Sequence, residues 1–114
     1  MRKTKFRAWE KELKKWYYSE EMGLSGFWGL VEQEVLENVC EYVGLKDSKG
    51  KEIYEGDIVA NELGNQKWEV RYVSNGFVGV IPDEHDLQLW PTTCENIEVI
   101  GNIYENPELL NQPD

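Results

Sequence analysis

The single histidine of the chain, His85, lies in an acidic segment, which is the first place to look for chemistry. Asp83, Glu84 and Asp86 surround the imidazole and favour its protonated form, which is neither a general base nor a metal ligand. The three carboxylates attract cations, but they lack the spacing of a calcium-binding loop. We therefore interpret His85 as a loop residue, and we expect neither a catalytic site nor a metal site here.

The two cysteines, Cys40 and Cys94, stand alone in the sequence and lack the paired spacing of a zinc site. We expect both to be free, buried thiols of a cytosolic protein. Gly23, Gly26 and Gly29 lack the lysine and the hydroxyl residue of a phosphate-binding loop. No acid–base pair stands out among the 22 acidic residues. We therefore expect a protein that is not an enzyme and needs no cofactor.

The length of the chain limits how many domains can position these side chains. Its 114 residues predict one domain, residues 1–114. No apolar run approaches the roughly 20 residues of a membrane helix. The basic N-terminus lacks the apolar stretch of a secretory signal. These features favour a protein of the cytoplasm that does not enter a membrane.

The formal net charge of −10 is unevenly distributed. Residues 1–19 carry seven Lys and Arg against two Glu, a net +5, so the other 95 residues carry −15. An acidic body repels phosphate backbones, whereas the N-terminal segment does not. The charge therefore argues against nucleic acid as a partner of most of the chain.

Strict alternation near the N-terminus predicts a β-strand. One face of this strand carries Thr4, Phe6 and Ala8, and the other carries Lys3, Lys5, Arg7 and Trp9. Because aromatic residues suited to a returning strand follow, we interpret residues 3–19 as a hairpin with a basic face. Trp9 would be an exposed platform that anchors a protein interface or stacks a nucleic-acid base. The candidate interface residues are Lys3, Lys5, Phe6, Arg7 and Trp9.

Three backbone reversals carry recognisable turn chemistry. In Asp47–Gly50, the aspartate can bond its own backbone and the glycine fits the last position. Glu55–Asp57 combines a glycine suited to positive φ with a carboxylate that can cap the bend. An Asn-Gly pair further on is a strong hairpin signal. We predict structural roles for the turn residues Asp47, Gly50, Gly56, Asp57, Asn75 and Gly76.

Residues 20–45 support two interpretations. The glycines at 23, 26 and 29 are expected to interrupt any regular element in the first part. From Trp28 to Val43, apolar residues recur every four positions, which is typical of a helix and leaves an α+β fold with a helix within 28–43 as the alternative. We favour a strand over roughly 36–45, because that stretch is rich in Val and Tyr and runs into a turn.

Further short strands are predicted at 51–54, 58–60, 66–73, 77–81 and 96–104, with Trp68 and Tyr72 facing a core. Asn106 and Pro107 then begin a short helical turn. Short strands separated by turns favour a mainly β fold. We expect a small antiparallel sheet that curls into a partly open barrel, with an N-terminal hairpin and a C-terminal helical turn.

Three groups of motifs frame nearly the whole chain: Phe6-Arg7-Ala8-Trp9 with Tyr17-Tyr18, Gly44-Leu45-Lys46-Asp47 leading into residues 50–59, and residues 98–110. In these motifs the chain resembles the YopX family of phage and prophage proteins. The family typically has Asp after Arg-Ala-Trp, where Glu10 stands here. The resemblance implies a mainly β fold, a phage or prophage origin and self-association. It implies no activity and carries over no site residue.

We therefore predict a phage or prophage accessory protein in the cytoplasm of the bacterial host, which acts by binding protein. Its expected partners are other copies of itself, through a basic hairpin laid against a neighbouring acidic body, and host or phage proteins. The alternative is a nucleic-acid-binding module that uses the hairpin and Trp9. Because phosphate contacts weaken steeply as salt rises, salt dependence separates the two.

Overall fold

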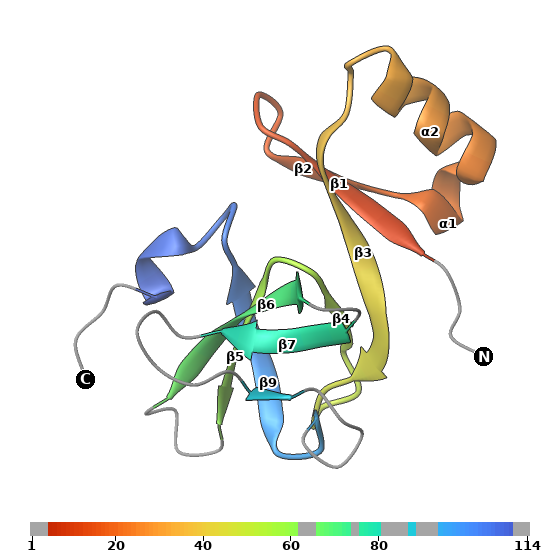
Figure 1. The fold of residues 1–114 in the computed structure, drawn as a ribbon. Helices are drawn as coiled ribbons and strands as arrows, with labels where there is room; N and C mark the ends of the chain where they lie inside the picture. The colour runs from red at the N-terminus through yellow and green to blue at the C-terminus, as the bar shows by residue number, and fades with distance from the viewer. Residues whose placement is uncertain (1–4, 62–65, 74–75, 81–86, 89–93, 111–114) are drawn as a thin grey trace. The chain divides into compact units, whose positions relative to one another are not determined.

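The computed structural model describes residues 5–61, 66–73, 76–80, 87–88 and 94–110. Strands dominate this part of the chain, which confirms the mainly β fold (Figure 1). The predicted short helical turn near the C-terminus is also present, as a 3₁₀ helix. In chain order the elements are β1 (Phe6–Glu10), β2 (Lys15–Tyr18), α1 (Ser19–Met22), α2 (Leu24–Glu32), β3 (Glu37–Lys46), β4 (Glu52–Tyr54), β5 (Asp57–Asn61), β6 (Lys67–Val73), β7 (Gly76–Val80), β8 (Leu87–Gln88), β9 (Ile97–Asn102) and the 3₁₀ helix η1 (Pro107–Leu110).

The chain forms two compact units, Met1–Tyr42 and Val43–Asp114. The first unit contains an antiparallel sheet in the order β2-β1-β3, together with both α-helices. Strand β3 continues into the second unit, where β4 pairs with it. The second unit also contains η1 and a five-stranded sheet in the order β8-β7-β6-β5-β9, which curls into a half-barrel (Figure 1). This curled sheet confirms the partly open barrel.

Helix α2 runs through Gly26 and Gly29, so the expectation that these two glycines interrupt a regular element is wrong. Gly23, with φ 78°, does interrupt it, because it separates α1 from α2. Phe27 is fully buried and lies 6.5 Å from the ring of Phe6 on β1. A methyl group added at Gly26 or Gly29 would meet no atom within 4 Å, so these glycines face open space and cost only helix propensity. Packing of one aromatic residue against the sheet therefore outweighs the low propensity.

The predicted strand over 36–45 is confirmed as β3, and the alternative of one helix within 28–43 is not. Helix α2 ends at Glu32, and the next residues turn the chain into β3. The four-residue spacing therefore spans two elements. Its early positions lie on α2, and its later valines, Val39 and Val43, are inward-facing residues of β3.

The core of the second unit lies within the half-barrel. It consists of Val43, Ile53, Val59, Trp68, Val70, Cys94, Ile97 and Val99. Buried Trp68 confirms the core prediction, whereas the side chain of Tyr72 lies outside the described part. Strands β6 and β7 pair as an antiparallel hairpin, with Val73 opposite Gly76. Gly76 is therefore a strand residue and Asn75 lies outside the described residues, so the Asn-Gly turn itself stays a prediction.

Both predicted turns that precede β5 are confirmed. The Asp47 carboxylate accepts hydrogen bonds from the N–H of Lys49 at 2.9 Å and of Lys51 at 2.8 Å, and Gly50 has φ 83°. In the second bend, Gly56 has φ 89°, and the Asp57 carboxylate accepts a hydrogen bond from the Tyr54 N–H at 2.8 Å. The two carboxylates therefore satisfy backbone donors, which is a structural role.

Candidate functional site

Two cations of the predicted basic face, Lys5 and Arg7, are buried, so this part of the face is not exposed. Lys5 and Arg7 are 7% and 6% exposed. The ammonium of Lys5 lies 3.2 Å from a carboxylate oxygen of Glu20 and 4.7 Å from the ring centroid of Tyr42. The Arg7 guanidinium lies 4.0 Å from the ring centroid of Trp16. Both cations are thus engaged within the first unit.

Trp9 is only 8% exposed, so the prediction of an exposed platform is wrong. Trp16 stands directly opposite it on β2, and their ring centroids are 5.2 Å apart. A cross-strand aromatic pair of this kind stabilises a hairpin. The period-two alternation placed Trp9 on the strand face opposite Phe6. It could not predict that Trp16 of β2 packs against Trp9 on that face.

Strand β1 lies between β2 and β3, so both of its backbone edges are already paired. Phe6 to Trp9 therefore cannot pair as an added strand with the sheet of another subunit. Phe6 is half-buried, and its ring packs edge-on against the ring of Trp28, with the two centroids 5.1 Å apart. Lys3, the remaining candidate, lies outside the described residues. His85 and its acidic neighbours also lie outside them.

The two thiols are free and buried, as predicted. Burial, with a smaller contribution from the Asp47 carboxylate, raises the pKa of Cys94 to about 11. The thiol is therefore protonated at neutral pH, which does not favour a nucleophile or a metal ligand. Among the described residues, no group of three or more His, Cys, Asp and Glu side chains is placed to hold a metal ion.

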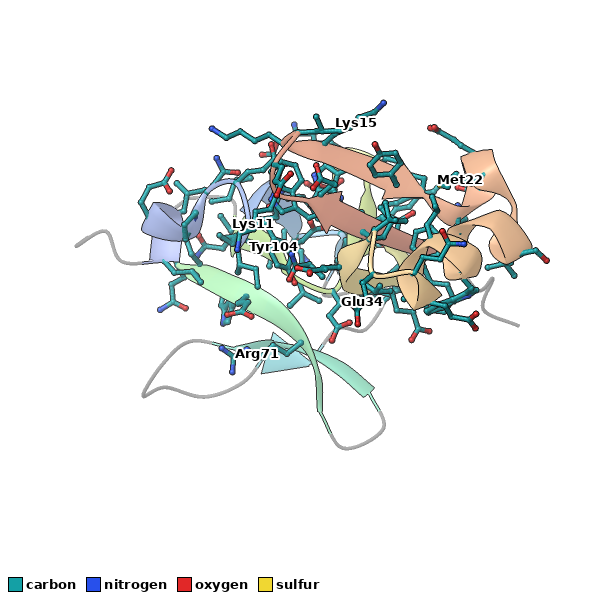
Figure 2. All side chains as sticks on the ribbon, turned by 90° about the horizontal axis from the view of Figure 1, so that it is seen from above. Lys11, Lys15, Met22, Glu34, Arg71 and Tyr104 are labelled. Atoms are coloured by element: carbon teal, nitrogen blue, oxygen red, sulfur yellow. The ribbon has the colours of Figure 1, made fainter. Side chains whose placement is uncertain are left out.

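The first unit carries a groove of about 600 Å³ between the β1–β2 hairpin and the segment that joins α2 to β3. Trp9 and Tyr17 line it together with two exposed apolar residues, Leu13 and Val35, which are 69% and 51% exposed. The charged residues that line it are Glu10, Lys11, Glu12, Glu34 and Glu37. Figure 2 shows Lys11 and Glu34, one from each of the two segments.

Local hydrogen bonds hold the hairpin side of the groove in place. The Glu10 carboxylate accepts hydrogen bonds from the N–H of Glu12 at 3.2 Å and of Leu13 at 2.5 Å. Lys14 then takes φ 53°, which returns the chain into β2. This side is therefore an ordered turn that presents the Leu13 side chain outward.

The opposite side of the groove is shaped by two more residues at positive φ. Glu34, after the end of α2, has φ 62°, and the next N–H, that of Val35, donates to the Leu30 carbonyl at 2.9 Å. Asn38 has φ 54° and is the extra residue of a bulge, because Ala8 pairs with Val39 but Trp9 pairs with Glu37. Of the three positive-φ residues other than glycine that the structure describes, Glu34 lines this groove, and Lys14 and Asn38 each follow a lining residue in the sequence. Residues at positive φ often cluster at functional sites.

The sequence did not reveal the groove, because its walls are separate in the chain and only the β1–β3 pairing brings them together. Two signals existed in hindsight. Leu13 is the one apolar residue in the charged segment 10–15, and residues 16–45 contain six Glu but no Lys or Arg. Neither signal identifies a surface without the pairing register.

The fold and these surfaces define a class: a small, mainly β protein whose carboxylates brace turns and whose exposed apolar residues border a groove. A crystal structure of protein EF1440 from Enterococcus faecalis has a similar fold, with a TM-score of 0.69 and 22% sequence identity over 96% of this chain and 99% of that chain. The family model described as YopX protein matches residues 26–111, across both units, and the chain belongs to the YopX family. No curated protein matches. No helix within the described ranges is long and apolar enough to cross a membrane.

Proposed function

We propose that this chain is a non-enzymatic, self-associating protein-interaction domain, which acts as an accessory protein of a phage or prophage in the cytoplasm of the bacterial host. The observation that carries the proposal is the groove of the first unit, where Leu13 and Val35 leave apolar surface exposed beside carboxylates. Exposed apolar side chains rimmed by polar ones are typical of protein interaction sites. The partners are other copies of the chain and a host or phage protein.

The disposition of the acidic side chains supports a binding role over an enzymatic one. The carboxylates of Glu10, Asp47 and Asp57 accept hydrogen bonds from backbone N–H groups. A carboxylate committed to a turn is poorly placed to shuttle protons. The raised pKa of Cys94 likewise does not favour a thiolate nucleophile.

Nucleic-acid binding is the second candidate. Its predicted residues Lys5, Arg7 and Trp9 are buried, which weakens it. The remaining described cations of the hairpin are exposed in or next to its turn, close in sequence to Glu10 and Glu12. They are Lys11, Lys14 and Lys15. The strong excess of carboxylates over the rest of the chain opposes contact with phosphate backbones.

Light scattering behind a sizing column tests self-association. At tens of micromolar, we expect an assembly larger than one chain at both low and high salt, because apolar burial supplies most of the stability of such contacts. A chain that runs as a monomer at both salt concentrations would contradict the proposal. Binding to a fluorescent single-stranded oligonucleotide that falls steeply with salt would favour the second candidate instead.

A further inference from the structure

We propose that the groove is a reciprocal contact surface between two copies of this chain. The hairpin tip of each copy, Lys11 to Lys14, would lie beside the acidic wall of the other, Glu34 to Glu37. This inference rests on the self-association proposed above and assigns it to one surface. Figure 2 shows Lys11 of the hairpin tip and Glu34 of the acidic wall.

The two segments carry opposite net charge: Lys11 to Lys14 has two lysines and one glutamate, a net +1, and Glu34 to Glu37 has two glutamates, a net −2. In the hairpin tip, Leu13 is 69% exposed and lies between the exposed side chains of Glu12 and Lys14. In the acidic wall, Val35 is 51% exposed and lies between the exposed carboxylates Glu34 and Glu37. Contact between the two apolar side chains would remove both from water. The flanking charges would then select the partner segment and its register.

A second copy is the occupant that this chemistry fits, because the chain itself carries both halves of the contact. When one molecule presents a surface and its complement, a two-fold axis forms the contact twice. A groove of about 600 Å³ lies within the usual size range of binding pockets, so a large apolar side chain has room to enter it.

Both segments are held in their conformations before any partner arrives. The Glu10 carboxylate fixes the tip through the N–H groups of Glu12 and Leu13. The bond from the Val35 N–H to the Leu30 carbonyl fixes the wall to the end of α2. Because less freedom is lost on binding, preformed surfaces of this kind associate at a lower entropic cost.

Two charge-reversal variants test the contact. The tip variant is Lys11→Glu with Lys14→Glu, and the wall variant is Glu34→Lys with Glu37→Lys. Each alone opposes like charges at both contacts, so we expect dimerisation at least about 30-fold weaker than in the wild type. Sedimentation equilibrium of the full chain at low salt measures this change. Leu13→Asp should weaken dimerisation to a similar extent.

An equimolar mixture of the tip variant and the wall variant provides the decisive measurement. In a mixed dimer the acidic tip meets a basic wall and the basic tip meets an acidic wall, so both contacts return and we expect association close to that of the wild type. Rescue in trans cannot come from repairing the fold within one chain. The matched control is Glu95→Lys with Glu98→Lys, two exposed residues of the second unit, which should associate like the wild type.

Each outcome has a definite meaning, provided that circular dichroism shows unchanged secondary structure. A wild-type monomer at tens of micromolar would overturn this inference together with the proposed self-association. A wild-type oligomer whose tip and wall variants associate normally would overturn only the assignment to this surface. Weaker association in both variants without rescue in the mixture would overturn the reciprocal contact.

Discussion

The side-chain carboxylate of Asp47 and the backbone N–H of Val99 are joined by a 2.8 Å hydrogen bond, across 52 positions of the chain. The same carboxylate accepts hydrogen bonds from the N–H groups of Lys49 and Lys51. Asp47 is 6% exposed, so water cannot readily replace it. One side chain thus shapes the turn after β3 and ties that turn to β9.

Asp47→Ala should lower the free energy of unfolding by about 2–4 kcal/mol, because three backbone donors lose their acceptor, one of them buried on β9. Urea denaturation followed by tryptophan fluorescence measures the loss. Lys49→Ala, on an exposed side chain of the same turn, is the control and should have little effect. An Asp47→Ala midpoint equal to that of the control would show that the carboxylate is dispensable.

Gly56→Val should destabilise the protein by about 1–3 kcal/mol, since a β-branched residue does not tolerate positive φ. Gly56 has φ 89°, its N–H donates to the Val70 carbonyl at 2.9 Å, and its carbonyl accepts from the Ile103 N–H at 2.9 Å. The backbone therefore cannot relax without losing these bonds. Chemical denaturation measures the change.

The contrast for this substitution is Gly26→Ala, at a helical position with no atom within 4 Å of the added methyl group. It should raise stability by about 0.5–1 kcal/mol through helix propensity. If both glycine variants shifted the midpoint in the same direction, the special backbone conformation assigned to Gly56 would lose its support.

The Cys94 thiol predicts a dependence on pH. Its pKa in the folded protein is raised from 9.0 to about 11, first by burial and then by the Asp47 carboxylate. Folding thus favours the protonated thiol, and this contribution is fully present below about pH 9 and lost as pH rises toward about 11. The unfolding free energy should therefore fall between about pH 9 and about pH 11 by up to roughly 3 kcal/mol from this group.

Cys94→Ala isolates that contribution from other groups that titrate in the same range. The difference in unfolding free energy between wild type and variant should shrink as pH rises through this window. A difference that stays constant with pH would mean that the folded protein does not favour the protonated thiol.

Local chemistry made the turns predictable. Asp47 and Asp57 each accept hydrogen bonds from N–H groups within a few residues, and Gly50 and Gly56 supply positive φ, so the local sequence specifies each turn. The bond from Val99 to Asp47 is the part that the local sequence could not predict. Helix α2 was missed for the opposite reason. Its stability comes from Phe27 packed near Phe6, which is 21 positions away in the sequence and invisible to propensity.

The error at Trp9 shows the same limit for a site. Period-two alternation placed Trp9 on the face opposite Phe6, but its exposure depends on Trp16, and hence on the hairpin register. Prediction of the groove would also require knowledge of the β1–β3 register, because the extra residue Asn38 in the bulge places Glu37 opposite Trp9. Surfaces of this kind become visible only once strand pairing is known.

The central position of β5 in its sheet determines how fast its amide protons exchange with solvent. Its residues pair with β6 on one side and β9 on the other, and Asp57 to Ala60 are all buried. Amide protons at Ile58 and Val59 can reach solvent only when the surrounding sheet separates. Their deuterium exchange should therefore occur at the rate set by complete unfolding of the second unit, whereas the exposed Gly26 in α2 exchanges through local opening.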